Sequence, residues 1–290
     1  MKKIKLYIAT YKRNDVLAET LDCLFDSDFT EVCDGEVFVL SNHTSIEIQD
    51  RHKDKVKVIR NEGRPDWSNG NLSESWNQAL VHGFKDLKKP DCDYVVTFQN
   101  DALVDKNWCS NVIKFHEKFD YIKGQFGDNV MSFSPEHIKK VGLYDERYCS
   151  IQFKEADFDI RSMQRNKDRV YLNDIMHRIE HNNNPSFEFD VVGHRNIKDN
   201  EDGDPRRRAD DGEQSVIWET ARAGIYRAYS WRWFTHKWNG TWKSSPSIRP
   251  WCIGWSDDFK KNPPQGQIKE VVRYPYFEKD IDKSVYEVPC

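Results

Sequence analysis

The chain has 290 residues, of which 38% are hydrophobic and 32% are charged. This composition is that of a globular protein long enough to bury a sizeable core, and it excludes disorder of the whole chain. The 44 basic and 48 acidic residues leave a formal net charge of -4, so no global positive field recruits nucleic acid or an anionic membrane.

No transmembrane or secretory segment is predicted. The apolar runs are far shorter than the roughly 20 residues that a transmembrane helix needs. The N-terminus MKKIKLYIAT has a basic start, but its apolar part is short and no small-residue cleavage site follows. Seven cysteines are scattered along the chain without a CxxC pair, which indicates reduced thiols rather than a zinc or redox site. We therefore expect a cytoplasmic protein.

Short β-rich runs alternate with helical patterns in the first half of the chain, which is typical of βα units around a mostly parallel sheet. Strands are expected at residues 5–10, 36–40, 56–60, 93–98 and 169–173. The run at residues 93–98 is the most apolar, so we expect it at the centre of the sheet.

Helices are predicted between these strands from apolar residues at helical spacing. They are expected at about residues 16–24, 72–84, 108–119, 135–141 and 155–165. The first begins at Asn14 or Asp15, and Ser134 with Pro135 is a favourable start for the fourth.

The pattern divides the chain into three parts. Residues 1–181 are expected to form the α/β domain. Residues 182–215 are polar and turn-rich with little periodicity, which predicts a flexible loop or lid. Residues 216–290 are expected to form an aromatic-rich helical extension, and the stretch as far as Trp255 holds seven of the ten tryptophans.

Polar residues end the apolar strand at residues 93–98: Gln99, Asn100 and Asp101 follow it, and Asp105 lies shortly after. Ligands collect at the carboxyl ends of parallel strands, and a carboxylate there can bind Mg²⁺ or Mn²⁺, which share oxygen ligands with a diphosphate. A helix cap or turn explains the same residues equally well from this stretch alone.

Two further candidates follow. The first is a group of three carboxylates within five residues at a helix start: Glu155, Asp157 and Asp159. One of them can act as a general base. Taken alone, however, this stretch is more typical of a solvated turn that caps the helix. His181 follows the last predicted strand and is a candidate metal ligand or acid/base group, with His177 competing and a structural histidine as the alternative.

Together, residues 3–181 resemble the family 2 nucleotide-sugar glycosyltransferases, which have the GT-A fold, with a mostly parallel, Rossmann-like central sheet flanked by helices. LYIATYKRNDVLAETLDCL is similar to the family's opening strand and helix, where Thr10, Tyr11 and Arg13 begin the donor pocket. VFVLSNHTS is similar to the second strand, with Ser41 in place of the aspartate that contacts the nucleotide base and Asn42 after it.

Three later stretches extend the resemblance. VIRNEGRPDWSNGNLSESWNQAL is similar to the family's Asn-x-Gly segment and the helix after it, through Asn61, Gly63 and Asn77. TFQNDALVD takes the place of the metal-binding acidic motif, with Asn100 for the leading acid, Asp101 as the retained acid and Ala102 offering no ligand.

VGLYDERYCSIQFKEADFDIR is similar to the segment that carries the catalytic base. This alignment gives Asp157 the base position and Asp159 and Arg161 supporting positions, while Ala156 replaces the usual glutamate. His181 stands where such enzymes often place a histidine near the metal.

The resemblance implies transfer of a sugar from a nucleoside-diphosphate sugar to an acceptor hydroxyl, with inversion at the anomeric carbon. We expect the acceptor to be a glycan. Asp157 would be the base, and Asp101 with His181 would hold Mn²⁺ or Mg²⁺ against the diphosphate. The implied donor site comprises Thr10, Tyr11, Arg13, Ser41, Asn42, Asn61, Gly63, Asn77, Asn100 and Asp101.

The aromatic block has two interpretations. A helix with Ile217, Ala221, Ile225 and Tyr229 on one face can pack on the sheet. Alternatively, the block contributes to the acceptor site, where Trp231 and Trp233 would contact the acceptor together with Asp159 and Arg161.

Two alternatives for the function remain. Basic residues stand between the tryptophans of the aromatic block, which is also typical of nucleic-acid binders, so a modified base in DNA is an alternative acceptor. A module that kept the sugar-nucleotide pocket and lost catalysis is the other alternative, supported by Ser41, Asn100, Ala102 and Ala156.

Overall fold

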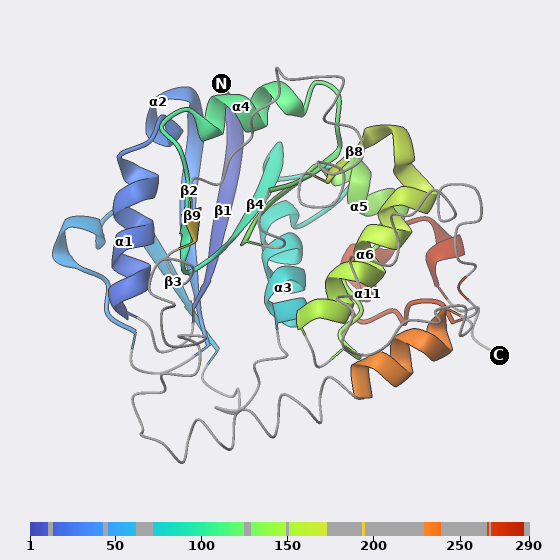
Figure 1. Ribbon diagram of the computed structural model, residues 1–290. Coiled ribbons are helices and arrows are strands. Elements are labelled where there is room, and N and C mark those ends of the chain that lie inside the picture. The colour runs from blue at the N-terminus through green and yellow to red at the C-terminus, as the bar shows by residue number, and fades with distance from the viewer. Residues whose placement is uncertain are drawn as a thin grey trace, which may run out of the picture.

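In the computed structural model, a mixed sheet with helices on both faces forms the centre of the molecule (Figure 1). The structure describes residues 1–10, 14–42, 46–61, 72–124, 129–148, 151–172, 193–194, 229–238, 266 and 268–286. Within these residues seven strands form the main sheet in the order β3-β2-β1-β4-β7-β6-β8.

All strands of this sheet except β7 bring their carboxyl ends to one edge. Strands β1, β2, β3 and β4 are parallel neighbours, and β7 lies antiparallel between β4 and β6, so β6 and its parallel partner β8 run with β4. Their bounds are β1 (Lys2–Thr10), β2 (Cys33–Ser41), β3 (Val56–Arg60), β4 (Tyr94–Gln99), β6 (Tyr121–Lys123), β7 (Val130–Phe133) and β8 (Val170–Leu172). This edge is where open α/β sheets bind ligands.

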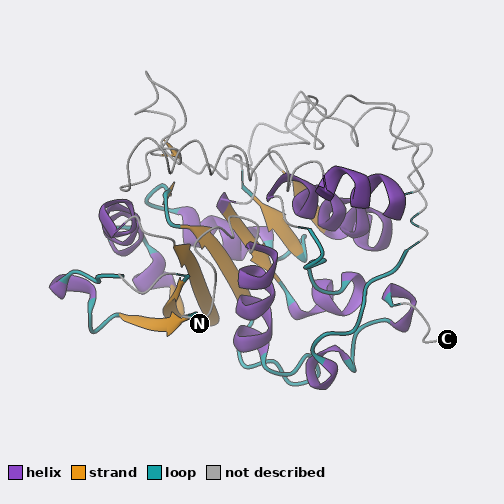
Figure 2. Ribbon diagram, turned by 90° about the horizontal axis from the view of Figure 1, so that it is seen from below, coloured by secondary structure: helices purple, strands orange, loops and turns teal. Residues whose placement is uncertain are grey.

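Helices cover both faces of the sheet, as Figure 2 shows for strands in orange between purple helices. Alternate residues of β1 point to opposite faces: Ile4, Leu6 and Ile8 join the core under α1 (Asn14–Phe25) and α4 (Trp108–Phe115). Tyr7 and Ala9 join the core under α3 (Leu72–Phe84), α5 (Pro135–Val141) and α6 (Ile151–Asn166). The inner strands are buried on both sides, as their continuous apolar runs predict.

Smaller elements complete the described chain. They are α2 (Phe29–Val32), α11 (Pro275–Glu278), three 3₁₀ turns (Asp50–His52, Lys167–Arg169 and Lys283–Val285), and the antiparallel pair β5 (Ala102–Leu103) and β9 (Gly193–His194). A further helix covers residues 229–237. In the described part of the chain no helix is long and apolar enough to cross a membrane. Cys23, Cys33, Cys92 and Cys109 are free thiols, as expected.

The predicted fold class, an α/β GT-A arrangement with a mostly parallel sheet, is confirmed, and β4 is the central strand as predicted. Strands β6 and β7 were not predicted, because runs of three and four residues are too short for a periodic pattern. The helix expected to reach Phe119 ends at Phe115, although Phe119 still packs on the core. Helix α6 begins four residues before the expected start.

The described part of the C-terminal extension packs on the core rather than standing apart. Phe234 and Trp238 are 1% and 2% exposed and belong to the same core as α3, α5 and α6. Tyr229, expected on a buried stripe, is 51% exposed, and Ile217, Ala221 and Ile225 lie outside the described residues. The three-part division of the chain stays a prediction.

Candidate functional site

Four residues predicted from separate stretches meet at the carboxyl edge of the sheet. Thr10 ends β1, and Asn42, Asn61 and Asn100 come directly after β2, β3 and β4. The Asn100 side chain donates to the Thr10 hydroxyl over 3.2 Å, and the Asn61 side chain donates to the Asn42 amide oxygen over 3.0 Å. Ser41, in register with Thr10, accepts the Asn61 backbone N–H over 2.8 Å.

Helix α3 holds two of these amides in place. Asn61 and Gln78 exchange two hydrogen bonds of 2.9 and 3.0 Å, and the Asn42 side chain donates to Ser75 over 3.2 Å. Side chains fixed in this way lose little conformational entropy when a ligand binds. The edge is therefore a preorganised row of amide and hydroxyl groups.

Asp101 lies in the turn after Asn100 and immediately before β5. It is 5% exposed, so it is not a solvated turn residue. The hydroxyl of Thr20 on α1 donates to the Asn100 carbonyl over 2.6 Å and ties this turn to the first helix. Capping is done by other carboxylates: Asp28 accepts the N–H groups of Cys109 and Ser110 at the start of α4.

The three carboxylates of α6 face two different sides. Residues four apart share a helix face, whereas residues two apart point away from each other. Glu155 and Asp159 face Lys123 at the carboxyl end of β6, whose ammonium lies 3.4 and 2.7 Å from their oxygens. Asp157 and Arg161 face the C-terminal segment instead and pair over 3.0 Å.

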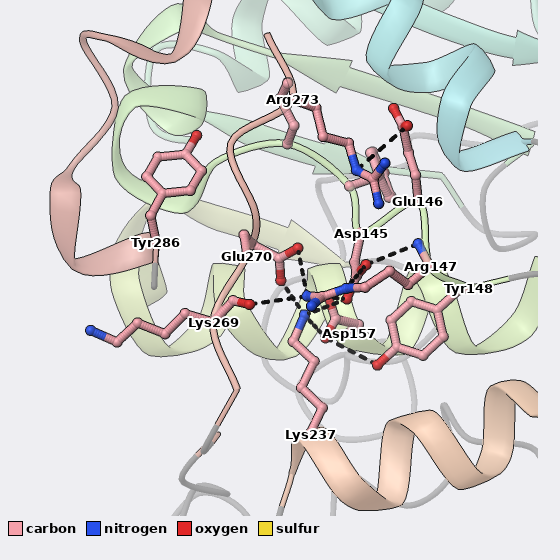
Figure 3. A network of polar contacts seen from close by, with 12 residues as sticks. Asp145, Glu146, Arg147, Tyr148, Asp157, Lys237, Lys269, Glu270, Arg273 and Tyr286 are labelled. Carbon is pink, nitrogen blue, oxygen red and sulfur yellow. Dashed lines mark hydrogen bonds and ion pairs between the residues drawn. The ribbon is translucent and has the colours of Figure 1, made fainter. Parts of the chain in front are cut away.

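Asp157 is fully buried, with 0% exposure, and its carboxylate meets several donors (Figure 3). The Lys237 ammonium lies 2.8 Å from Oδ1, the Trp238 indole donates over 3.0 Å, and the Tyr148 hydroxyl donates over 3.3 Å. These donors come from the loop before α6 and from the helix at residues 229–237 with the residue after it. In this arrangement the oxygens of Asp157 are engaged inside the protein.

The charge cluster comprises Asp157 with Asp145, Arg147, Arg161, Lys237 and Glu270, three carboxylates and three cations. One oxygen each of Asp145, Asp157 and Glu270 lies within 4.8 Å of the others, the spacing of a metal site. The Lys237 ammonium sits among them, 2.9 Å from Asp145 and in contact with Glu270. The protein thus supplies its own cation to this acidic triad.

Within the charge cluster, electrostatics favour the ionised form of Asp145. Burial alone raises the pKa of Asp145, but Lys237 and Arg147 outweigh it and hold the pKa of that carboxyl well below its usual value. The cluster joins the loop before α6, α6 itself, the helix at residues 229–237 and the segment around Glu270. It is a buried clamp for the C-terminal extension.

Two other predicted site residues bond to the backbone around α5. Asn77 is 0% exposed, donates to the Tyr144 carbonyl and to Glu146, and accepts the Tyr144 N–H, and its donor-site role stays a prediction. Arg161 also donates to the carbonyls of Val141 and Leu143 at the end of α5.

The predicted acceptor-side tryptophans are half-buried beside the charge cluster. Trp233 donates to Asp145 over 3.2 Å and stacks under Arg147, while Trp231 packs on Phe153. Tyr11, Arg13, Gly63, His177 and His181 lie outside the described residues, and their roles stay predictions.

Sequence reasoning missed Lys123, Asp145, Lys237 and Glu270. No local pattern marks a lysine that will be buried, because its partners lie far away in the sequence. Asp145 and Arg147, in YDERY, stand within the stretch that resembles the family's base-bearing segment, and this was the available signal.

No family model and no curated protein matches the chain. Among solved structures, it is similar to Staphylococcus aureus TarS 1-349, with 17% identity and a TM-score of 0.43 over 59% of this chain and 57% of that one. It is similar to the mannosyltransferase PcManGT from Pyrobaculum calidifontis, in complex with GDP-Man and Mn²⁺, with 13% identity and a TM-score of 0.43 over 80% and 75%.

A third similar structure is glucosyl-3-phosphoglycerate synthase from Mycobacterium tuberculosis, in complex with Mn²⁺, UDP and phosphoglyceric acid. The identity is 12% and the TM-score 0.43, over 59% of this chain and 68% of that one. A likeness of this size concerns the fold and says nothing of this chain's activity.

Proposed function

We propose that the chain is a glycosyltransferase that moves a sugar from a nucleoside-diphosphate sugar to an acceptor hydroxyl of a glycan, with inversion. The observation that carries the proposal is the meeting of Thr10, Asn42, Asn61, Asn100 and Asp101 at one sheet edge. These residues were predicted as donor ligands from separate motifs. Amide and hydroxyl groups fixed at strand ends suit a nucleotide and its sugar.

Asp101 is the residue proposed to face the diphosphate. Its carboxylate, nearly buried at the end of the central strand, is the hard oxygen donor that Mn²⁺ or Mg²⁺ prefers. Such an ion, when bound, would act as a Lewis acid for the leaving diphosphate. Asn100 orients the turn through its bond to Thr10, and His181 is the proposed second ligand.

A carboxylate of α6 is proposed as the base. It takes the proton of the acceptor hydroxyl as that oxygen attacks the anomeric carbon, while the bond to the diphosphate breaks and its electron pair leaves with the phosphate. Asp157 is the base that the resemblance implies. Glu155, which contacts the buried Lys123 and Lys154, is proposed as the second candidate, and the variants Asp157→Asn and Glu155→Gln separate the two.

The test is Asp101→Asn, assayed with a panel of sugar nucleotides plus Mn²⁺ for binding, hydrolysis and transfer. We expect turnover to fall by about 100-fold or more, since the residue acts on the leaving group. The matched control is Asp34→Asn, an exposed carboxylate of β2 at the opposite end of the strand, which should leave turnover unchanged.

If the wild-type chain binds a sugar nucleotide without turnover, it is an inactive sugar-nucleotide-binding module rather than a transferase. If it binds no member of the panel, both the transferase and the module hypotheses are wrong. Transfer to modified DNA with a steep salt dependence would change the acceptor and keep the donor site.

A further inference from the structure

A pocket of about 460 Å³ lies between α3 and the segment that leads into α11, two elements labelled in Figure 1. Glu74, Gln78, His82 and Lys85 line one side, and Tyr274 and Tyr276 line the other. Its size is in the range of small-molecule sites. Asn61 of the donor edge lines its end. We propose that this pocket binds an uncharged segment of a glycan beside the donor edge.

The aromatic side of the pocket suits a sugar ring. Tyr276 is 62% exposed, and a large aromatic side chain left open at a pocket rim marks an interaction site more often than a scattered surface residue does. A flat ring can cover the apolar C–H face of a pyranose, while its hydroxyl reaches polar partners.

The pocket wall is held rigidly. The Tyr274 hydroxyl donates to Glu146 over 2.9 Å, and Glu146 in turn accepts the Asn77 side chain of α3 over 2.8 Å. Glu278 accepts the backbone N–H of Arg273 over 2.7 Å and fixes the turn before α11. The Tyr274 ring is therefore already ordered when a ligand binds, which reduces the entropy lost on binding.

The α3 side supplies donors and acceptors for hydroxyl groups. Gln78 uses one N–H and one lone pair in its exchange with Asn61, which leaves its amide further hydrogen-bonding capacity. The His82 ring contacts the Tyr7 hydroxyl over 2.7 Å at Nδ1, which fixes the ring orientation. Glu74 adds a carboxylate, which can accept from vicinal hydroxyls.

The charges of the pocket disfavour phosphate and nucleotide. The Lys85 ammonium is paired with Asp91 over 2.7 Å. Burial lowers the pKa of His82, so the ring is neutral at pH 7. The lining thus holds no surplus of positive charge for a phosphate, which favours an uncharged polyhydroxy ligand.

The pocket begins beside the donor edge, because Gln78 pairs with Asn61. This inference rests on the proposed function in one respect only. If the chain transfers a sugar to a glycan, the glycan segment held along α3 would be the part of the acceptor that lies far from the reacting hydroxyl. Binding energy from that part would lower the KM for long acceptors and leave short acceptors unaffected.

The experiment measures binding of uncharged hexasaccharides, made of glucose, mannose or N-acetylglucosamine, by titration calorimetry on the full chain. We expect one of them to bind and Tyr276→Ala to weaken it by about tenfold or more, the effect of losing roughly 1.4 kcal/mol. Tyr229→Ala, which removes an exposed ring outside the pocket, is the matched control and should bind as the wild type. Glu74→Gln, a milder change, should also weaken binding.

Sugar-nucleotide binding in the same variants separates this inference from the proposed function, and Tyr276→Ala should leave it unchanged. Hexasaccharide binding without sugar-nucleotide turnover would support the pocket while removing the proposed reaction. Failure of all three hexasaccharides to bind, or equal binding by Tyr276→Ala and the wild type, would overturn the pocket assignment.

Discussion

At the scale of single residues, Glu155 and Asp157 show how two positions on one helix meet different partners. Asp157 has 0% exposure and pairs with Arg161 and Lys237. Glu155 keeps some solvent access, with 10% of its side chain exposed, and points to the carboxyl edge through Lys123. A base must reach the acceptor proton, and the base role of Asp157 stays a prediction, with Glu155 as the second candidate.

If Glu155 is the base, Glu155→Gln should lower kcat by about 100-fold or more while nucleotide affinity stays near the wild-type value. Asp159 still compensates the buried Lys123, but the buried Lys154 loses its charged contact with Glu155, so Tm should also fall. Asp157→Asn should likewise lower Tm, since it leaves Lys237 and Arg161 with one partner fewer. Loss of transfer at unchanged Tm in Asp157→Asn, with an active Glu155→Gln, would assign the base role to Asp157.

At the scale of elements, the helix at residues 229–237 is attached to α6 by a charge inside the core. Figure 3 shows Lys237 reaching from this helix toward Asp145, Asp157 and Glu270. Replacing a buried ion pair by apolar residues can be neutral, but removing one partner leaves uncompensated charge. One ammonium group therefore contributes strongly to the attachment of this helix, beside the packing of Phe234 and Trp238.

We predict that Lys237→Met destabilises the chain by about 3 to 5 kcal/mol, because three buried carboxylates lose their shared cation. Urea unfolding measures the change. Lys279→Met removes a half-exposed lysine paired with Asp86 and should cost less than about 1 kcal/mol. A Lys237→Met protein as stable as Lys279→Met would show that the charge cluster does not hold the extension.

At the scale of the whole molecule, two buried histidines link stability to pH. His116 contacts Ser132 and the Phe119 carbonyl, and His137 contacts Ser162 and Asn166. Burial lowers the pKa of each to about 3. The unfolded chain protonates them near pH 6.5, so their contribution is complete above that pH and is lost as the pH falls towards 3.

We predict that each histidine reduces the free energy of unfolding by roughly 2 kcal/mol between pH 7 and pH 5. Urea unfolding at both pH values measures this loss, and His137→Gln should remove about half of it. A free energy of unfolding that is equal at pH 7 and pH 5 would contradict the neutral, buried state of both rings.

The sequence by itself determined the parallel half of the sheet, its central strand and the residues at the strand ends. Apolar runs of strands, the spacing of apolar residues in helices and capping residues are all local patterns. Once a strand is located in the sequence, the residues at its carboxyl end are identified as well. Thr10, Asn42, Asn61 and Asn100 meet because parallel strands end at one edge. Short β6 and β7 carry no such local pattern.

Only the tertiary structure decided which carboxylate is buried and which helix face each one occupies. Trp238 donates to Asp157 across 81 residues of sequence, and Asn77 bonds Tyr144 across 67. Burial of a charge depends on a partner that the packed fold brings near, and such partners leave no periodic signal. For this reason the motif predicts Asp157 as the base, whereas only packing shows that its carboxylate lies in the charge cluster and that Glu155 contacts Lys123 and Lys154.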